Sequence, residues 1–158
     1  MRILTICIAM LLLPCMVTAW EGDDTLRYYM SKSDLVVAGR IVSEPIDLVH
    51  ETGVTHSSFR FKVEEVLFGT RPDLQDDSFQ VVILTVNTAG DGRPELLKKD
   101  SRCLLFLKNI LNAWHGADRW FQVQPYNSLM IQSIKRLTAE EHEGNTKSHN
   151  RAIDSYKK

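Results

Sequence analysis

The strongest structural signal in this chain is a period-two alternation of apolar and charged residues. Three apolar and three charged side chains alternate without interruption: Phe59, Arg60, Phe61, Lys62, Val63 and Glu64. Successive side chains of a β-strand point to opposite faces, so the pattern predicts a strand with one buried and one solvated face. We expect the three apolar residues to be buried and Arg60 and Lys62 to be exposed.

The alternation slips by one position immediately afterwards. Glu65 stands where an apolar residue is due, and the pattern resumes one residue late at Val66 and Phe68. An extra residue that shifts the register is a β-bulge, and bent barrel strands use bulges to turn corners. A solvated pair is the expected state of the adjacent Glu64 and Glu65.

Four further segments have the composition of strands. They cover residues 35–42, 79–86, 102–110 and 119–124, and Gly39 marks a bulge or bend in the first of them. Five strands separated by turn signals, mostly without helices between them, favour an antiparallel barrel or sandwich.

Two helical segments flank these strands. Residues 25–33 carry apolar residues at helical spacing behind Asp23 and Asp24, either of which is a suitable N-cap. The second predicted helix begins at Thr138, which forms a capping box with Glu141. Gly144 is expected to interrupt that helix and leave a solvated tail.

The first 19 residues have the three parts of a secretory signal peptide. Arg2 precedes an uncharged apolar run, and small residues up to Ala19 precede Trp20. The alternative is a retained membrane anchor, but the uncharged stretch 3–20 is interrupted by Pro14 and is shorter than the about 20 apolar residues of a spanning helix. We expect cleavage after Ala19, no stable membrane insertion afterwards, and a secreted or periplasmic protein.

The mature chain is expected to form one domain. Cleavage leaves 139 of the 158 residues, and the predicted organisation is a signal peptide (1–19), a β-barrel domain (20–137) and a C-terminal helix and tail (138–158). Its 18 basic and 20 acidic side chains argue against nucleic-acid binding, which needs a concentrated positive face. Cys103 is the one cysteine left, so no internal disulfide forms, and its apolar surroundings indicate a buried thiol.

The set of strand features resembles a known family. Gly39 in the first strand, the bulged second strand ending at residues 66–69, and the fourth strand after residues 96–99 are similar to small exported OB-fold proteins. The resemblance is to the netrin and tissue-inhibitor-of-metalloproteinases type, especially its bacterial relatives, and spans residues 34–125. It implies a five-stranded OB-like Greek-key barrel with helices at its ends, and binding rather than catalysis.

The chain departs from the animal members of that family. Those inhibitors begin with a cysteine that chelates the protease zinc, and several disulfides hold them together. Here Trp20 begins the mature chain and Cys103 has no partner. The resemblance therefore implies a fold, and it does not carry over zinc chelation.

Motif analysis predicts no catalytic residue, no metal site and no cofactor. The sequence contains no Gly-x-Ser-x-Gly, His-Glu-x-x-His or Cys-x-x-Cys motif. His50 and His56 flank a hairpin tip. A two-residue turn would put the two imidazoles on opposite faces of the hairpin, whereas a three-residue loop would put them on the same face. In either case a third metal ligand is missing. His142 and His149 lie in the predicted solvated tail.

The segment between the fourth and fifth predicted strands supplies the candidate binding residues. Residues 111–118 are expected to form a loop at one rim of the barrel, with Trp114, His115 and Asp118 available to stack on and hydrogen-bond a ligand. The alternative is that Trp114 folds back onto Trp120 or the barrel end, because large aromatic residues are usually mostly buried.

These observations lead to a functional expectation. The chain is predicted to be an exported, non-catalytic binding module with a protein or glycan partner. The alternatives are an enzyme whose site is dispersed across the fold and a structural component of the cell envelope. Convergent polar side chains in a deep pocket would favour the enzyme.

Overall fold

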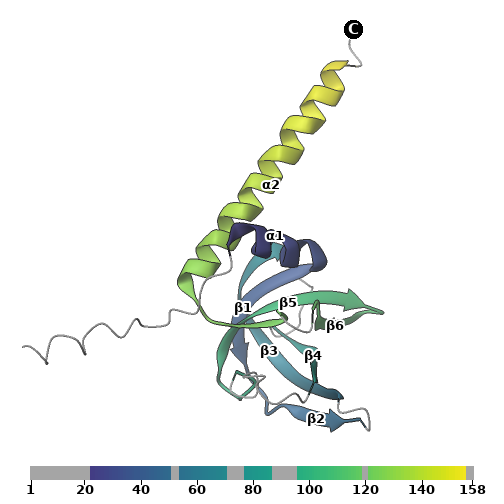
Figure 1. Cartoon of the computed structure of the whole chain (residues 1–158), viewed down its shortest axis with the longest axis vertical. Helices are drawn as coiled ribbons and strands as arrows, with labels where there is room; N and C mark the ends of the chain where they lie inside the picture. Colours follow the sequence, from purple (N-terminus) through teal and green to yellow (C-terminus); the bar gives the residue numbers. More distant parts are fainter. Residues whose placement is uncertain (1–21, 51–53, 71–76, 87–95, 119–120, 156–158) are drawn as a thin grey trace, which may run out of the picture.

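The protein is mainly β, with one helix before and one after a single sheet (Figure 1). The computed structural model describes residues 22–50, 54–70, 77–86, 96–118 and 121–155, so the predicted signal peptide lies outside the described residues. The elements, in chain order, are α1 (Asp23–Lys32), β1 (Leu35–Ile41), β2 (Ile46–Val49), β3 (Val54–Gly69), β4 (Ser78–Val86), β5 (Arg102–Ile110), β6 (Ala113–Gly116), β7 (Val123–Pro125) and α2 (Ser128–Ser155).

The strand count differs from the sequence-based expectation of five. Four predicted strands correspond to β1, β3, β4 and β5, whereas the strand predicted over 119–124 is wrong at its start, because Phe121 and Gln122 precede β7. Two short strands, β2 and β6, were not predicted as such. The described residues thus form a sheet of seven strands.

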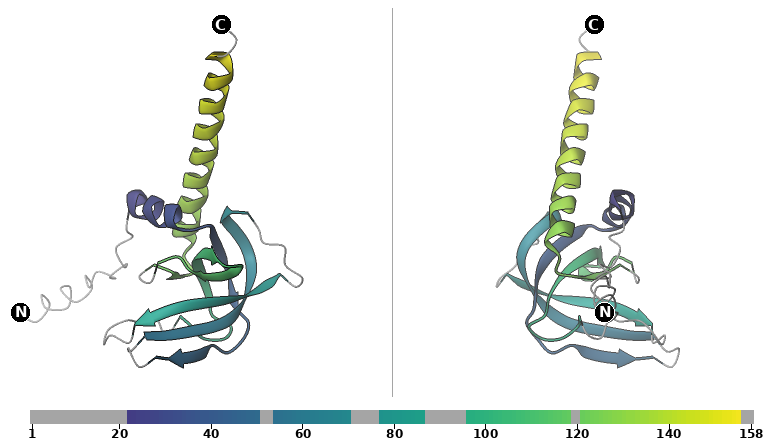
Figure 2. Two further views of the ribbon diagram at one scale, coloured as in Figure 1. Left: turned by 90° about the vertical axis from the view of Figure 1, so that its right-hand side faces the viewer. Right: turned by 60° about the vertical axis from the view of Figure 1, so that its left-hand side comes forward.

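Five of the strands form a closed ring of pairings. The order is β1–β3–β4–β6–β5, and β5 pairs back onto β1, while β2 flanks β3 and β7 flanks β5. The β4–β6 pairing is parallel, so the expectation of a purely antiparallel sheet is wrong at that point. Figure 2 shows the strongly curved sheet and the long helix α2 that projects from it.

The predicted bulge in β3 is confirmed, and it is one of two. The β1–β3 register skips Glu64 between Val63 and Glu65, and skips Leu67 further on. Gly39 lies opposite the first bulge. A Cβ at position 39 would overlap the Lys62 carbonyl and lie 2.8 Å from the Phe61 ring, so the glycine permits the close approach of the two strands.

Two apolar clusters hold the fold together. The first lies inside the ring and contains Phe59, Phe61 and Val63, which confirms the alternation, since Arg60 and Lys62 are exposed. The second lies between the other face of β1 and β5 and the two helices, and includes Leu26, Phe106 and Ile134. Because both faces of β1 and β5 are covered, these strands read as nearly continuous apolar runs.

The Gln122 side chain completes the ring where β6 ends. Its amide nitrogen donates to the Leu84 carbonyl at 2.5 Å, and its Oε1 accepts from the Leu84 N–H at 3.3 Å. The Gln122 carbonyl accepts from the Phe106 N–H at 3.0 Å. One residue therefore links β4 to β5 in place of a backbone strand, and it is 1% exposed.

Both helix starts differ from the prediction. Gly22 is the N-cap of α1 and makes no side-chain cap bond, so Asp23 and Asp24 lie in the first turn, where the helix dipole favours carboxylates. Helix α2 begins ten residues before the predicted start. Its cap is Asn127, whose Oδ1 accepts from the N–H groups of Leu129 and Met130 at 2.9 and 3.4 Å.

The predicted capping box at Thr138 is wrong because that residue lies inside α2. Its hydroxyl hydrogen-bonds the carbonyls of Ile134 at 2.9 Å and Leu67 at 3.1 Å, which ties the helix to β3. The helix also continues through Gly144 to Ser155, so the predicted interruption is wrong. None of the helices in the described ranges is long and apolar enough to span a membrane.

Candidate functional site

The three candidate binding residues do not converge. Trp114 lies on β6 and is half-buried against the inner cluster, with its ring centroid 5.9 Å from that of Phe79. His115 is the next residue of the strand and therefore faces the opposite way, while Asp118 lies in the turn that follows. Trp114 therefore packs onto the ring of strands, which was the alternative to its being free for a ligand. It also lies on the opposite side of β6 from His115.

The predicted loop over 111–118 is a hairpin instead. Leu111 and Asn112 connect β5 to β6 and both have positive φ, 52° and 65°. Two left-handed central residues make the tight turn whose twist matches antiparallel strands. Leucine is unusual in that conformation, and Leu111 is 96% exposed at the tip.

A surface that the sequence reasoning missed lies on β2, β3 and β4, on the side away from the inner cluster. We call it the outer face. Residues directly opposite one another in neighbouring strands share a face. One such row therefore joins Ile46 to Ser58, Val82 and His115, and the next joins Leu48 to His56 and Leu84.

The outer face is apolar and open to solvent. Ile46 and Leu48 on β2 are 73% and 61% exposed, Leu84 on β4 is 40% exposed, and Val82 beside Leu84 is half-buried. Ser58 and His56 of β3 lie between these two strands. Single exposed apolar residues are normal on protein surfaces, but adjacent ones form a patch that marks an interaction site. The available signal was the short alternation of Ile46, Asp47 and Leu48 after Pro45, which is too brief to predict a strand.

Strand β2 forms one edge of this face. Among the described strands it pairs with β3 alone, so its other edge has no strand beside it. The Ser57 hydroxyl donates to Asp47 Oδ1 at 2.6 Å and holds that carboxylate back against β3. The side chains that remain on β2 are Ile46, Leu48 and Val49, all of them exposed.

The histidine pair lies at the end of the same face. The His50 N–H donates to the Val54 carbonyl at 2.8 Å, which leaves three residues between these positions and selects the three-residue alternative. The two imidazole centroids are 4.5 Å apart, so His50 and His56 share a face. No third candidate ligand joins them in the part of the chain that the structure describes.

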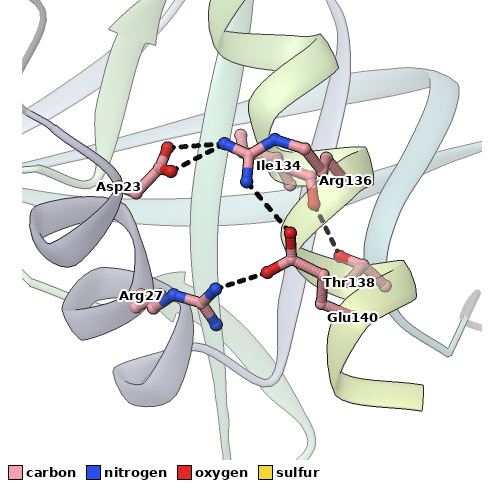
Figure 3. A network of polar contacts seen from close by, with 6 residues as sticks. All are labelled: Asp23, Arg27, Ile134, Arg136, Thr138 and Glu140. Atoms are coloured by element: carbon pink, nitrogen blue, oxygen red, sulfur yellow. Dashed lines mark hydrogen bonds and ion pairs between the residues drawn. The ribbon is translucent and has the colours of Figure 1, made fainter. Parts of the chain in front are cut away.

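A network of charged residues clamps α1 to α2 (Figure 3). Arg136 donates to both carboxylate oxygens of Asp23 at 2.7 and 2.8 Å and to Glu140 at 3.0 Å, and Arg27 donates to Glu140 at 2.5 Å. Hydrogen bonds from Arg27 and Arg136 lower the pKa of Glu140. These charges satisfy one another, which favours a structural role for the network.

A groove of about 470 Å³ opens beside this clamp. It is lined by Arg27, Met30, Ser31, Phe68, Leu137, Glu140 and Glu141. Its floor is formed by apolar side chains through which the two helices pack on β3. Its rim carries the ion pair of Arg27 and Glu140. Its lining polar groups are the Arg27–Glu140 pair, Ser31, whose hydroxyl donates to the Tyr28 carbonyl, and the surface carboxylate of Glu141, and this set does not resemble a catalytic arrangement.

The Cys103 thiol is another group that shows no sign of reactivity. Cys103 is fully buried on β5, and burial raises the pKa of its thiol to about 12. The thiolate is the reactive form of cysteine, so this side chain acts as a small apolar residue of the inner cluster.

Comparison with known proteins adds no family to this picture: no protein-family model matches the chain, and no curated protein matches it either. The exposed residues of the chain itself are therefore what points to a function.

Proposed function

We propose that the chain is an exported, non-catalytic binding module of the OB type that holds a protein partner on its outer face. The strand order supports the OB assignment, because β1 pairs with both β3 and β5 and closes a small Greek-key ring. The kinship with netrin-like and tissue-inhibitor-like proteins stays a prediction.

The observation that carries the proposal is the exposed apolar patch of Ile46, Leu48 and Leu84. OB folds bind their ligands on the face of the second and third strands of the ring, and these correspond here to β3 and β4. The edge strand β2 widens that face, and His115 on β6 borders it. Of the three residues predicted to bind, His115 thus keeps a place at the proposed interface.

The patch is large enough to matter for affinity. Fully burying an aliphatic side chain contributes roughly 1.5–3 kcal/mol relative to leaving it exposed. The exposed portions of Ile46 and Leu48 would each contribute about 1–2 kcal/mol on docking. Removing both, at about 2–4 kcal/mol together, should weaken a complex by roughly thirtyfold to nearly a thousandfold.

The test uses the mature chain, residues 20–158, as bait in the compartment to which it is exported. Captured proteins are compared for the wild type, for Ile46→Ser/Leu48→Ser, and for the control Leu129→Ser. Leu129 is 66% exposed on α2, far from β2 in the sequence and outside the outer face. We expect one partner to be lost from the β2 variant and retained by the control.

Two results would refute the proposed interface: capture that is unchanged in the β2 variant, or capture that both variants lose equally. Sedimentation of the purified wild type shows whether the partner is another copy of the chain. Export is tested separately by the intact mass of the natively exported protein. It should correspond to a chain that begins at Trp20, and a mass that includes residues 1–19 would contradict cleavage.

A further inference from the structure

A second exposed patch lies further along the same side of β3 and continues onto β1 and β5, where it carries a line of positive charge. Lys62 on β3 is directly paired with Arg40 on β1, and Arg40 is directly paired with Arg102 on β5. Neighbouring strands lie about 4.8 Å apart, so the three residues form a row roughly 10 Å long. We call it the basic row, and all three of its residues are exposed.

Folding accounts for only part of the basic row. Like charges directly opposite one another in a sheet are destabilising. The fold places three of them in succession, although the chain as a whole carries a formal net charge of −1. An anionic ligand bound at this exposed row would offset the repulsion that the fold leaves uncompensated.

One carboxylate lies within the row. Arg102 donates to Glu64 Oε2 through Nε at 3.0 Å and Nη2 at 2.5 Å, and Arg40 Nε is 3.8 Å from Oε1. The Glu64 hydrogen bond raises the pKa of Arg102. Within the described part of the chain, Lys62 has no ion-pair partner. The four side chains together keep a net charge of +2.

An aromatic ring extends the row. The guanidinium carbon of Arg102 lies 4.0 Å from the ring centroid of Tyr126, which is 39% exposed just after β7. An acidic sugar needs this combination: a flat apolar surface for the face of its ring and guanidinium groups for its carboxylate or sulfate. A single small anion would contact neither the tyrosine ring nor all three cations at once.

We propose that the basic row and Tyr126 bind an acidic polysaccharide, a glycan chain bearing carboxylate or sulfate groups. Successive anionic groups along the chain meet successive cations on β3, β1 and β5. The site does not depend on the apolar patch of Ile46, Leu48 and Leu84. Lys62 is on the same side of β3 as Ser58, but it lies four residues further along the strand, roughly 13 Å away. Failure of one proposal therefore leaves the other standing.

The direct test measures binding of a fluorescent heparin oligosaccharide, a sulfated uronate glycan, to the mature chain by anisotropy at low salt. The row variant is Arg40→Gln/Lys62→Gln. The matched control is Lys32→Gln/Lys108→Gln, which removes the same charge from α1 and from the far end of β5. We expect about tenfold weaker binding for the row variant, an unchanged control, and an affinity that falls as salt rises.

Two further variants separate a binding site from a structural ion network. Glu64→Gln removes the carboxylate that competes for both arginines, so it should tighten glycan binding several-fold, whereas a purely structural network would lose stability without any gain in binding. Tyr126→Leu should weaken binding and Tyr126→Phe should preserve it. Three results would overturn the proposal: no binding at low salt, equal losses in the row and control variants, or equal affinity for single-stranded DNA of the same charge.

Discussion

The closure of the ring by a side chain gives the sharpest test of the fold. Gln122 makes two hydrogen bonds to the backbone of Leu84 while its own carbonyl pairs with Phe106. Replacing Gln122 by leucine keeps the volume and the backbone bond. It removes the two hydrogen bonds that the Gln122 side chain makes to the N–H and carbonyl of Leu84. Strand β6 ends at Gly116 and supplies no replacement for them.

The expected loss follows from those two groups. A backbone group left without a partner in a buried setting costs about 1–3 kcal/mol. Leu84 is 40% exposed, so water reaches part of its surroundings and the lower part of that range applies. We expect Gln122→Leu to lower the free energy of unfolding by about 2–4 kcal/mol, which shifts the urea midpoint by about 1–2 M.

The matched control is Gln124→Leu on β7, which is only half-buried and should change stability by less than about 0.5 kcal/mol. Gly116→Ala provides a second route to the same contact, because a Cβ at position 116 would lie 2.7 Å from the Cβ of Gln122 and overlap its amide oxygen. Combined with Gln122→Ala, its cost should be less than additive. Equal effects of Gln122→Leu and Gln124→Leu would show that the side chain does not close the ring.

Three other outcomes are expected from the same structure. Phe61→Ala should cost about 3–5 kcal/mol in chemical denaturation and Lys62→Ala little, because only the first leaves a cavity in the inner cluster; similar losses would contradict the strand assignment. Trp114→Ala should lower the thermal midpoint by several degrees, because the ring packs on Phe79, and an unchanged midpoint would show that it is free to bind. Burial raises the Cys103 pKa to about 12, so the folded chain keeps a proton that the unfolded chain loses above the ordinary thiol pKa of 9.0. Stability should therefore fall as pH rises from about 9 to 12, by up to about 1.4 kcal/mol per pH unit, and Cys103→Ala should remove that dependence.

The sequence predicted those strands in which buried positions appear as a period-two alternation or as a long apolar run. The alternation around Phe61 identified β3 and its bulge, and the run that contains Cys103 gave β5 with its observed bounds. It did not reveal β6, because Leu111 and Asn112 lack the glycine that normally marks a tight hairpin. Only the pairing of β6 with β4 and β5 makes that segment a strand.

The candidate site was harder to predict for a related reason. Trp114 and His115 are adjacent in sequence, and a loop would let both face a ligand, whereas a strand sends them to opposite sides. The helix start was missed because Thr138 and Glu141 imitate a capping box inside α2. The hydroxyl bond of Thr138 to the Leu67 carbonyl is a tertiary contact that no local pattern encodes.

The clamp between the two helices bears on how quickly the chain can fold. Arg136 and Asp23 are 113 residues apart, and β1 closes the ring with a strand that begins only at Arg102. Contacts between residues so distant in sequence form after large losses of chain entropy, and folds dominated by them take milliseconds to seconds. During synthesis β1 stays without β5 until residues 102–110 have been made, and α1 stays without α2 until the segment from Ser128 onward has been made. β1 can pair with β3 early, whereas closure of the ring at β5 and the docking of α1 on α2 both wait for distant segments, so the native state is reached late.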